Sequence, residues 1–240
     1  MIKFLLLAAS ILFAACNSQQ SNKSENTTQT AEEPTAKLVA LSFDDGPNDI
    51  TTPKMLDLLE EFKVPASFFV IGQNINETTA KQMTRAISLG CEIQNHSYTH
   101  SFMTQLSQEV VAEEIRKTDE LIEKFTGTKP WMFRPPFIDH NEAMHQFISH
   151  TFICGVGCED WVPEKSAQQR YESVMAQVKD GDIILLHDFP GNDNTVEALR
   201  KLIPELKKQG YEFVTVTELF KRKNISPDSH NGKIYSNVMQ

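Results

Sequence analysis

The chain has 240 residues, of which 40% are hydrophobic and 23% are charged, and its formal net charge is -9. This length and composition are typical of one globular domain with short additional segments. Binding to nucleic acid needs clustered lysines and arginines, and the chain has no basic block. Composition therefore excludes nucleic-acid recognition.

The first residues have the pattern of a bacterial export signal. A positively charged start is followed by an apolar run from Phe4 to Ala15, which is short for a membrane span. Small residues then precede Cys16, as in a lipoprotein cleavage box. We expect residues 1–16 to be a lipoprotein signal peptide. The lipidated Cys16 would anchor the protein to the membrane of the bacterial cell envelope, on its periplasmic face or at the cell surface. Secretion with a free Cys16 is the alternative.

Composition separates both ends of the remaining chain from a central domain. Residues 17–36 contain almost no apolar side chain and cannot bury enough surface to fold, so we expect a disordered tether. Residues 223–240 are again polar, and we expect a loose C-terminal tail. The domain is expected over residues 37–222, and it is expected to be a monomer because no long apolar stripe is left over.

Strand-like and helix-like stretches alternate through the domain. Strands are predicted over residues 38–43, 66–71, 91–94, 131–133, 151–156, 182–186 and 211–216. Helices are predicted over residues 52–62, 79–89, 107–127, 166–179 and 195–209, with a last turn capped by Thr217. Seven strands that alternate with helices indicate parallel βα units. The predicted fold class is therefore α/β, a distorted barrel of the (β/α)7 type with parallel strands and outer helices.

Polar signatures follow five of the predicted strands. They are Phe43-Asp44-Asp45-Gly46-Pro47, His96-Ser97-Tyr98-Thr99-His100, Arg134-Pro135-Pro136-Phe137, Asp160-Trp161 and Leu185-Leu186-His187-Asp188. In parallel α/β folds, active sites are built at the C-terminal ends of the strands. We therefore expect the five signatures to converge on one metal-dependent hydrolytic site.

Two of these signatures contain the candidate metal ligands. Neighbouring carboxylates on an extended chain point to opposite sides, so one of Asp44 and Asp45 is expected to bind metal and the other to accept a proton. His96 and His100 are four residues apart, which places both imidazoles on one side of a helical turn. Imidazole favours zinc, cobalt or nickel over magnesium. A solvated acidic turn is the alternative for Asp44 and Asp45.

The other three signatures contain groups suited to acid–base chemistry and substrate contact. Arg134 can orient a carboxylate, and the two prolines after it leave the Phe137 amide as the next free donor for an oxyanion. Trp161 can stack on a sugar ring, with core packing as the alternative. Leu185 and His187 face the same side of a strand, and His187 is a candidate general acid or a satisfied core histidine.

Other histidines and cysteines of the domain lie outside these signatures. His140, His145 and His150 are expected at surface or helix positions. The cysteines are Cys91, Cys154 and Cys158, and they lack the Cys-x-x-Cys spacing of a structural zinc site. We expect free thiols, with a bridge between Cys154 and Cys158 as the alternative.

With all five motifs present, residues 37–222 resemble a NodB-like polysaccharide deacetylase of carbohydrate esterase family 4. The resemblance implies that a divalent metal, preferably zinc with cobalt or nickel as alternatives, is bound by Asp45, His96 and His100. It implies that Asp44 is the general base, that Arg134 holds this base in place, and that His187 protonates the leaving group. It further implies roles for three residues at the substrate: the amide of Phe137 at the oxyanion, and Trp161 and Leu185 around the acetyl methyl group.

The implied function is removal of acetyl groups from an extracytoplasmic polysaccharide, either an N-acetyl amino sugar polymer or O-acetylated xylan. A catalytically inactive carbohydrate-binding lipoprotein is the alternative. A phosphatase would need a lysine and phosphate-binding turns at the site, and the five signatures contain neither. The sequence departs from the family pattern at Gly157, where many members have an acid, so the basicity of His187 must be set by another group. The stretch Phe137-Ile138-Asp139 is more typical of the acetylxylan-esterase-like branch.

Overall fold

The computed structural model describes residues 36–240. The predicted signal peptide, the lipid attachment at Cys16 and all of the predicted tether except Ala36 lie outside the described residues. Within the described part of the chain, no helix is long and apolar enough to cross a membrane.

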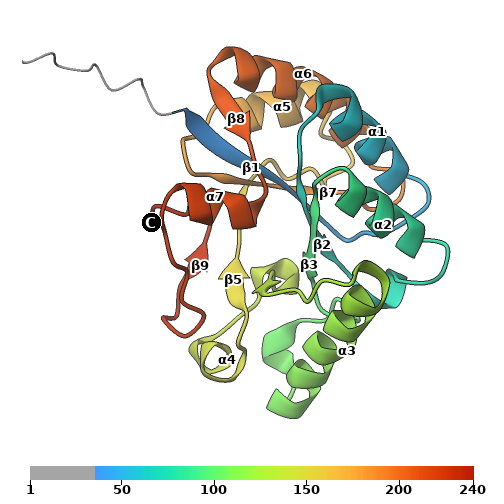
Figure 1. Ribbon diagram of the computed structural model, residues 1–240, viewed down its shortest axis with the longest axis vertical. Coiled ribbons are helices and arrows are strands. Elements are labelled where there is room, and N and C mark those ends of the chain that lie inside the picture. The colour runs from blue at the N-terminus through green and yellow to red at the C-terminus, as the bar shows by residue number, and fades with distance from the viewer. Residues whose placement is uncertain (1–35) are drawn as a thin grey trace, which may run out of the picture. The chain divides into compact units, whose positions relative to one another are not determined.

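A parallel sheet forms the centre of the fold (Figure 1). Its strands are β1 (Lys37–Asp44), β2 (Ser67–Val70), β3 (Glu92–Asn95), β4 (Met132–Phe133), β5 (Thr151–Ile153), β6 (Val156–Gly157), β7 (Ile183–His187), β8 (Tyr211–Phe213) and β9 (Ile234–Tyr235). They pair in the order β6-β7-β1-β2-β3-β4-β5-β9, and β8 also pairs with β1. Strand β1 is buried along its length after Lys37, as its nearly continuous apolar sequence predicts for a strand covered on both faces.

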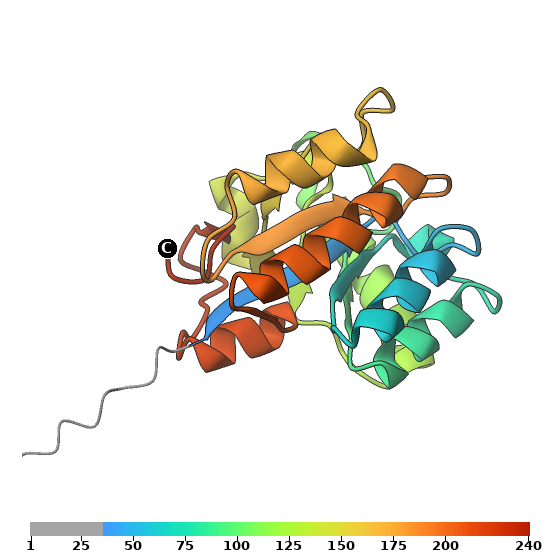
Figure 2. The same cartoon turned by 90° about the horizontal axis from the view of Figure 1, so that it is seen from above.

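Helices surround the sheet (Figure 2). They are α1 (Thr52–Phe62), α2 (Ala80–Ser88), α3 (Gln108–Thr126), α4 (Glu142–Phe147), α5 (Ala167–Met175), α6 (Asp193–Lys208) and α7 (Val216–Arg222). Contacts between neighbours run in the order α5-α6-α1-α2-α3, so these helices form a continuous outer layer. Their apolar faces and the strands they cover share one large core, which includes Leu41, Phe43, Leu59 and Leu199.

The barrel closes through a break in the predicted strand 151–156. Its first part, β5, pairs with β4, and its second part, β6, crosses to the other edge and pairs with β7. The chain makes this crossing at Gly155, where a Cβ atom would lie only 2.7 Å from the carbonyl oxygen of Ile183. Only glycine permits this close approach of two backbones. The sequence prediction of a distorted barrel is confirmed, whereas the single fifth strand is wrong.

The prediction of a loose C-terminal tail over residues 223–240 is wrong for its last part. Strand β9 pairs with β5, and the amide of Ile183 in β7 donates to the carbonyl oxygen of Ser236 over 2.9 Å. Tyr235 and Val238 are buried between these strands. Strand β9 could not be predicted from this polar segment, because its few apolar residues show no periodicity. They are ordered only by pairing with distant strands.

The predicted helices are all present, and each begins within about two residues of its predicted start. Thr215, not Thr217, caps α7, because its hydroxyl accepts from the amide of Glu218 over 3.2 Å. Helix α1 has Thr51 at its cap position and Pro53 in its first turn. The short helix α4 was not predicted; the side chain of Asn141 caps it.

Candidate active site

The five polar signatures meet at one mouth of the barrel, where β1, β3, β4 and β7 end. They line a cavity of about 560 Å³. The predicted site residues that line it are Asp44, Asp45, His96, His100, Phe137, Trp161, Leu185 and His187. Arg134 does not line the cavity; it is fully buried behind Asp44, to which it is hydrogen-bonded. The structure therefore brings together every residue that the sequence singled out for the site.

Asp45, His96 and His100 converge on a single point. Oδ1 of Asp45 lies 3.5 Å from Nε2 of His96 and 3.3 Å from Nε2 of His100. Ligand atoms that each bind one zinc ion at about 2.1 Å in tetrahedral geometry are separated by roughly 3.4 Å. Oδ1 of Asp45 is also buried without a hydrogen-bond partner among the described residues, as a ligand atom left for a cation would be. These three residues therefore fit a divalent metal.

The loop that carries the two histidines is not the predicted helical turn. Ser97 and His100 have positive φ angles of 65° and 60°, which interrupt any helix. The Asn95 side chain instead accepts from the Ser97 amide over 2.8 Å, and the Ser97 hydroxyl accepts from the His100 amide over 3.0 Å. Side chains, not helical hydrogen bonds, bring the imidazoles to one side, so the ligands were predicted correctly for a wrong geometric reason.

The electrostatics of this cluster favour the forms that bind a metal. Burial alone would raise the pKa of Asp45, but the neighbouring imidazoles, that of His96 foremost, bring it below its ordinary value. Burial and the neighbouring His96 lower the pKa of His100, so its imidazole is neutral at neutral pH. Nδ1 of His96 lies 2.6 Å from the carbonyl oxygen of Arg134 and donates to it, which leaves Nε2 of His96 free for a ligand role.

Asp44 is held by Arg134 on the inner side of the cluster. Nη1 of Arg134 donates to Oδ1 of Asp44 over 2.5 Å, and Nη2 donates to Ser42 and to the carbonyl oxygen of Cys154. The other oxygen of Asp44, Oδ2, lies 3.7 Å from Nε2 of His96 and faces the cluster. Asp44 is only 2% exposed, so the alternative of a solvated turn is wrong for this carboxylate.

His187 and Asp160 form a second pair at the end of β7, the strand next to β1. Nδ1 of His187 lies 2.8 Å from Oδ1 of Asp160, which is fully buried. Burial opposes the charged imidazole, but the hydrogen bond and charge of Asp160, aided by Asp44 and Asp45, raise the pKa of His187 to about 9. Asp160 was not predicted to have this role. It supplies the acid that the sequence lacks at Gly157, and its place beside Trp161 in a strand-end signature was the available signal.

Aromatic side chains form the rim of the cavity. Phe137 is 57% exposed and stacks on Phe102 with ring centroids 4.1 Å apart. Trp161 is 52% exposed and packs edge-on against His187, so core packing of this indole is wrong. Leu185 is buried in the cavity wall. Phe102 was not predicted, because it lies outside the five signatures, although it follows His100 by only two residues.

The remaining histidines and cysteines do not join the metal cluster. His145 lies in helix α4, as the prediction of surface or helix positions allows, and its side chain is buried. His150 is buried outside any helix, contrary to the prediction, and pairs with Asp119 over 3.1 Å. The cysteines of the described residues are free thiols, as predicted: Cys91, Cys154 and Cys158. Cys154 also borders the cavity.

The three candidate metal ligands, the ion pair of Asp44 with Arg134 and the pair of His187 with Asp160 lie together at the barrel mouth and define a hydrolase type of site. Residues 31–151 match the model of the polysaccharide deacetylase family. A peptidoglycan-N-acetylglucosamine deacetylase of Bacillus cereus is 38% identical over 200 residues, which cover 78% of this chain and 90% of that protein. The chain therefore belongs to the polysaccharide deacetylase family, and the resemblance inferred from the five motifs is confirmed.

Two further matches are to proteins whose names refer to xylan. A bifunctional xylanase/deacetylase of Pseudobutyrivibrio xylanivorans is 44% identical over 98% of this chain, which spans only 38% of that protein. The structure of a family 4 acetyl xylan esterase from Clostridium thermocellum, in complex with a cobalt ion, is 41% identical and superimposes with a TM-score of 0.83. The match covers 85% of this chain and 100% of the esterase chain.

Proposed function

We propose that this protein hydrolyses acetyl groups from a polysaccharide outside the cytoplasm, with a divalent metal bound by Asp45, His96 and His100. The observation that carries the proposal is the convergence of Asp45, His96 and His100 in a cavity that Asp44 and His187 also line. A base and an acid that both reach the bound carbonyl are what an addition–elimination at an acetyl group requires. Zinc is the preferred metal, with cobalt or nickel as alternatives.

Each residue of the site has a distinct part in this reaction. The metal, when bound, supplies a Lewis acid that polarises the acetyl carbonyl and acidifies water. Oδ2 of Asp44 takes the proton of the attacking water, while Arg134 holds Oδ1 and fixes the direction of the carboxylate. His187, protonated at neutral pH because Asp160 stabilises its charge, gives its Nε2 proton to the leaving oxygen or nitrogen of the sugar.

The cavity accommodates an acetyl group and leaves the sugar at its rim. Leu185 and Trp161 offer apolar contacts for the methyl group. The Phe137 amide is proposed to donate to the oxyanion, since the positive φ of Phe137 turns the backbone at the cavity wall. The exposed rings of Phe102 and Phe137 lie beside this opening, where a sugar can stack.

O-acetylated xylan is the substrate that we favour. The 44% identical relative is named a xylanase/deacetylase, and the similar cobalt-containing structure is named an acetyl xylan esterase. A polymer of N-acetyl amino sugars is the second candidate, because the Bacillus cereus relative matches over nearly its whole length. The sequence of the first 16 residues supports export and a lipid anchor at Cys16, and we infer a monomer in the cell envelope.

Acetate release from defined substrates tests this proposal. The protein is freed of metal with a chelator, reloaded with zinc, cobalt or nickel, and assayed on acetylated xylan, N-acetylated chito-oligosaccharides and peptidoglycan. We expect release that the chelator abolishes and the metal restores, with acetylated xylan as the fastest substrate. Metal uptake and glycan binding without acetate release would instead support an inactive carbohydrate-binding protein.

A further inference from the structure

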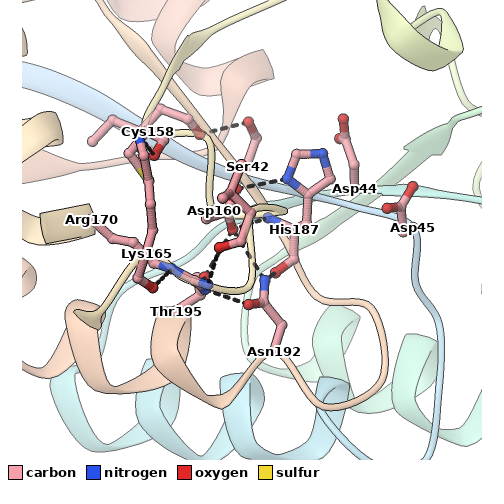
Figure 3. A network of polar contacts seen from close by, with 12 residues as sticks. Ser42, Asp44, Asp45, Cys158, Asp160, Lys165, Arg170, His187, Asn192 and Thr195 are labelled. Carbon is pink, nitrogen blue, oxygen red and sulfur yellow. Dashed lines mark hydrogen bonds and ion pairs between the residues drawn. The ribbon is translucent and has the colours of Figure 1, made fainter.

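A buried arginine lies behind the histidine–aspartate pair. Arg170 belongs to α5, is only 2% exposed, and points toward the N-terminus of α6 (Figure 3). Every acceptor of its hydrogen bonds is uncharged: the carbonyl oxygens of Val162 and Lys165, and the side-chain oxygens of Asn192 and Thr195. A buried cation that has only neutral acceptors is costly, which calls for a role beyond packing.

Arg170 fixes the direction in which the Thr195 hydroxyl donates. Nη1 of Arg170 lies 2.8 Å from Oγ1 of Thr195, and a guanidinium can only donate. The single hydroxyl proton of Thr195 is therefore available for another acceptor. Oδ2 of Asp160 lies 2.8 Å away and takes that proton.

The same guanidinium nitrogen fixes the amide of Asn192. It donates to Oδ1 of Asn192, so the other end of this amide, Nδ2, must face the opposite direction. Nδ2 of Asn192 donates to the His187 carbonyl oxygen over 2.8 Å and to Oδ2 of Asp160 over 3.2 Å. Two neutral side chains thus present donors, and no acceptor, to Asp160.

These contacts determine how Asp160 meets His187. Oδ2 of Asp160 is occupied by Thr195, Asn192 and the backbone amide of His187, the last over 2.9 Å. Only Oδ1 is left for the imidazole, at 2.8 Å from Nδ1 of His187. A carboxylate that accepts from so many donors is fixed in orientation, and it fixes the tautomer and the ring of the histidine.

We propose that Arg170 is a positioning residue for the deacetylation reaction. It orients Thr195 and Asn192 so that Asp160 is held as a fixed anionic acceptor, and His187 then presents its Nε2 proton to the leaving group. This inference rests on the proposed function, because it assigns Arg170 to the protonation step of that reaction and to no other step.

The test compares two kinds of leaving group. Departure of a sugar oxygen or nitrogen needs a proton, whereas 4-nitrophenolate leaves 4-nitrophenyl acetate without one. The variants are Thr195→Val, which keeps the shape but removes the donor to Asp160; Thr195→Ser, which restores the hydroxyl; and Arg170→Lys. Arg200→Lys on the outer surface of α6 is the matched control, since Arg200 pairs only with surface glutamates.

We expect kcat on the acetylated glycan to fall about 100-fold in Thr195→Val and Arg170→Lys, the lower end of the usual range for general acid catalysis. KM on the glycan and kcat on 4-nitrophenyl acetate should stay within about threefold of the wild-type values, and Thr195→Ser should recover most of the loss. His187→Ala should show the same selectivity for the leaving group.

Equal losses on both substrates, in variants that bind metal and melt like the wild type, would show a merely structural role and overturn the inference. Unchanged activity of both variants on the glycan would also overturn it. Failure of the wild-type protein to release acetate from any glycan would instead remove the proposed function. The conservative Thr195→Val variant keeps the test decisive if Arg170→Lys does not fold.

Discussion

Arg134 and Asp44 form a buried ion pair: their nitrogen and oxygen lie 2.5 Å apart, and the two side chains are 0% and 3% exposed. The pair occupies one carboxylate oxygen and leaves the other facing the metal ligands. A base that is fixed in this way needs no reorganisation when it accepts a proton.

Substitution Asp44→Asn should therefore separate catalysis from metal binding. We expect a loss of kcat of at least about 100-fold, as for removal of a positioned general base, with metal content equal to that of the wild type. Acetate release and elemental analysis of the same preparation measure both properties. Full turnover in this variant would refute the role of Asp44 as base.

Substitution His96→Ala should abolish stoichiometric metal binding. Only Asp45 and His100 would remain as ligands, and the wild-type increase in melting temperature on adding zinc should disappear. A ligand present at 100 times its Kd stabilises the folded state by about 2.7 kcal/mol, so the wild-type shift is measurable by calorimetry. His230→Ala is the control, because the ring of this histidine hydrogen-bonds to the His145 carbonyl oxygen and is part of neither the ligand cluster nor the cavity lining. Zinc-dependent stabilisation of the His96→Ala variant would contradict the ligand assignment.

The pH dependence of activity should report the pair of His187 and Asp160. The pKa of His187 is raised to about 9 by Asp160 against the effect of burial, so the acid is protonated at neutral pH. Activity should fall as the pH rises through this pKa. In Asp160→Asn the charge is lost, and the alkaline limb of kcat/KM should move to lower pH by about one unit or more. Both proteins carry the same metal in this comparison, and an unmoved limb would show that Asp160 does not tune His187.

Substitution Phe102→Ala should weaken binding of the polymer and not the chemistry. An exposed aromatic stacking contact contributes about 1 kcal/mol, so KM for acetylated xylan should rise roughly fivefold, while kcat on 4-nitrophenyl acetate should not change. Val110→Ala is the control, because Val110 is also 46% exposed but, unlike Phe102, does not stack on a ring that lines the cavity. An unchanged KM would remove Phe102 from the substrate-binding surface.

Glycine at position 46 should be required for stability. A Cβ atom there would lie 2.6 Å from Oδ1 of Asp188, whose carboxylate is fully buried. We expect Gly46→Ala to lower the free energy of unfolding by about 1–3 kcal/mol, the usual cost of overpacking. At Gly157 the nearest atom to such a Cβ would be 3.7 Å away, so Gly157→Ala is the matched control in denaturant unfolding. Equal stability of the two variants would contradict this steric argument.

Most strands along the chain and the residues of the site could be predicted because each is encoded by a local stretch of sequence. The apolar run of β1 ends at Asp44, and the other signatures likewise follow strand ends, so parallel topology alone brings them together. The geometry within each loop could not be predicted this way. The loop from His96 to His100 depends on the side chains of Asn95 and Ser97, which compete with helical hydrogen bonds.

Features that depend on long-range packing were missed for the same physical reason. The role of Asp160 exists only because α6 brings Asn192 and Thr195 to its carboxylate, more than thirty residues along the chain. Strand β9 has no periodic pattern and is ordered by its pairing with β5. Tertiary contacts of this kind override local sequence preferences.

The direction of β1 has a practical consequence for handling the protein. Its first residue and its catalytic aspartate lie at opposite ends of the barrel, about 23 Å apart for eight residues of extended chain. The Val238 amide donates to the Gly181 carbonyl oxygen, and the Gly181 amide donates to the carbonyl oxygen of Leu38 in β1. The C-terminal segment therefore packs at the end of the barrel where β1 begins, away from the mouth. A purification tag or an immobilising linker fused directly before β1 or after the C-terminal segment should therefore leave the mouth open to a long, unbroken glycan chain.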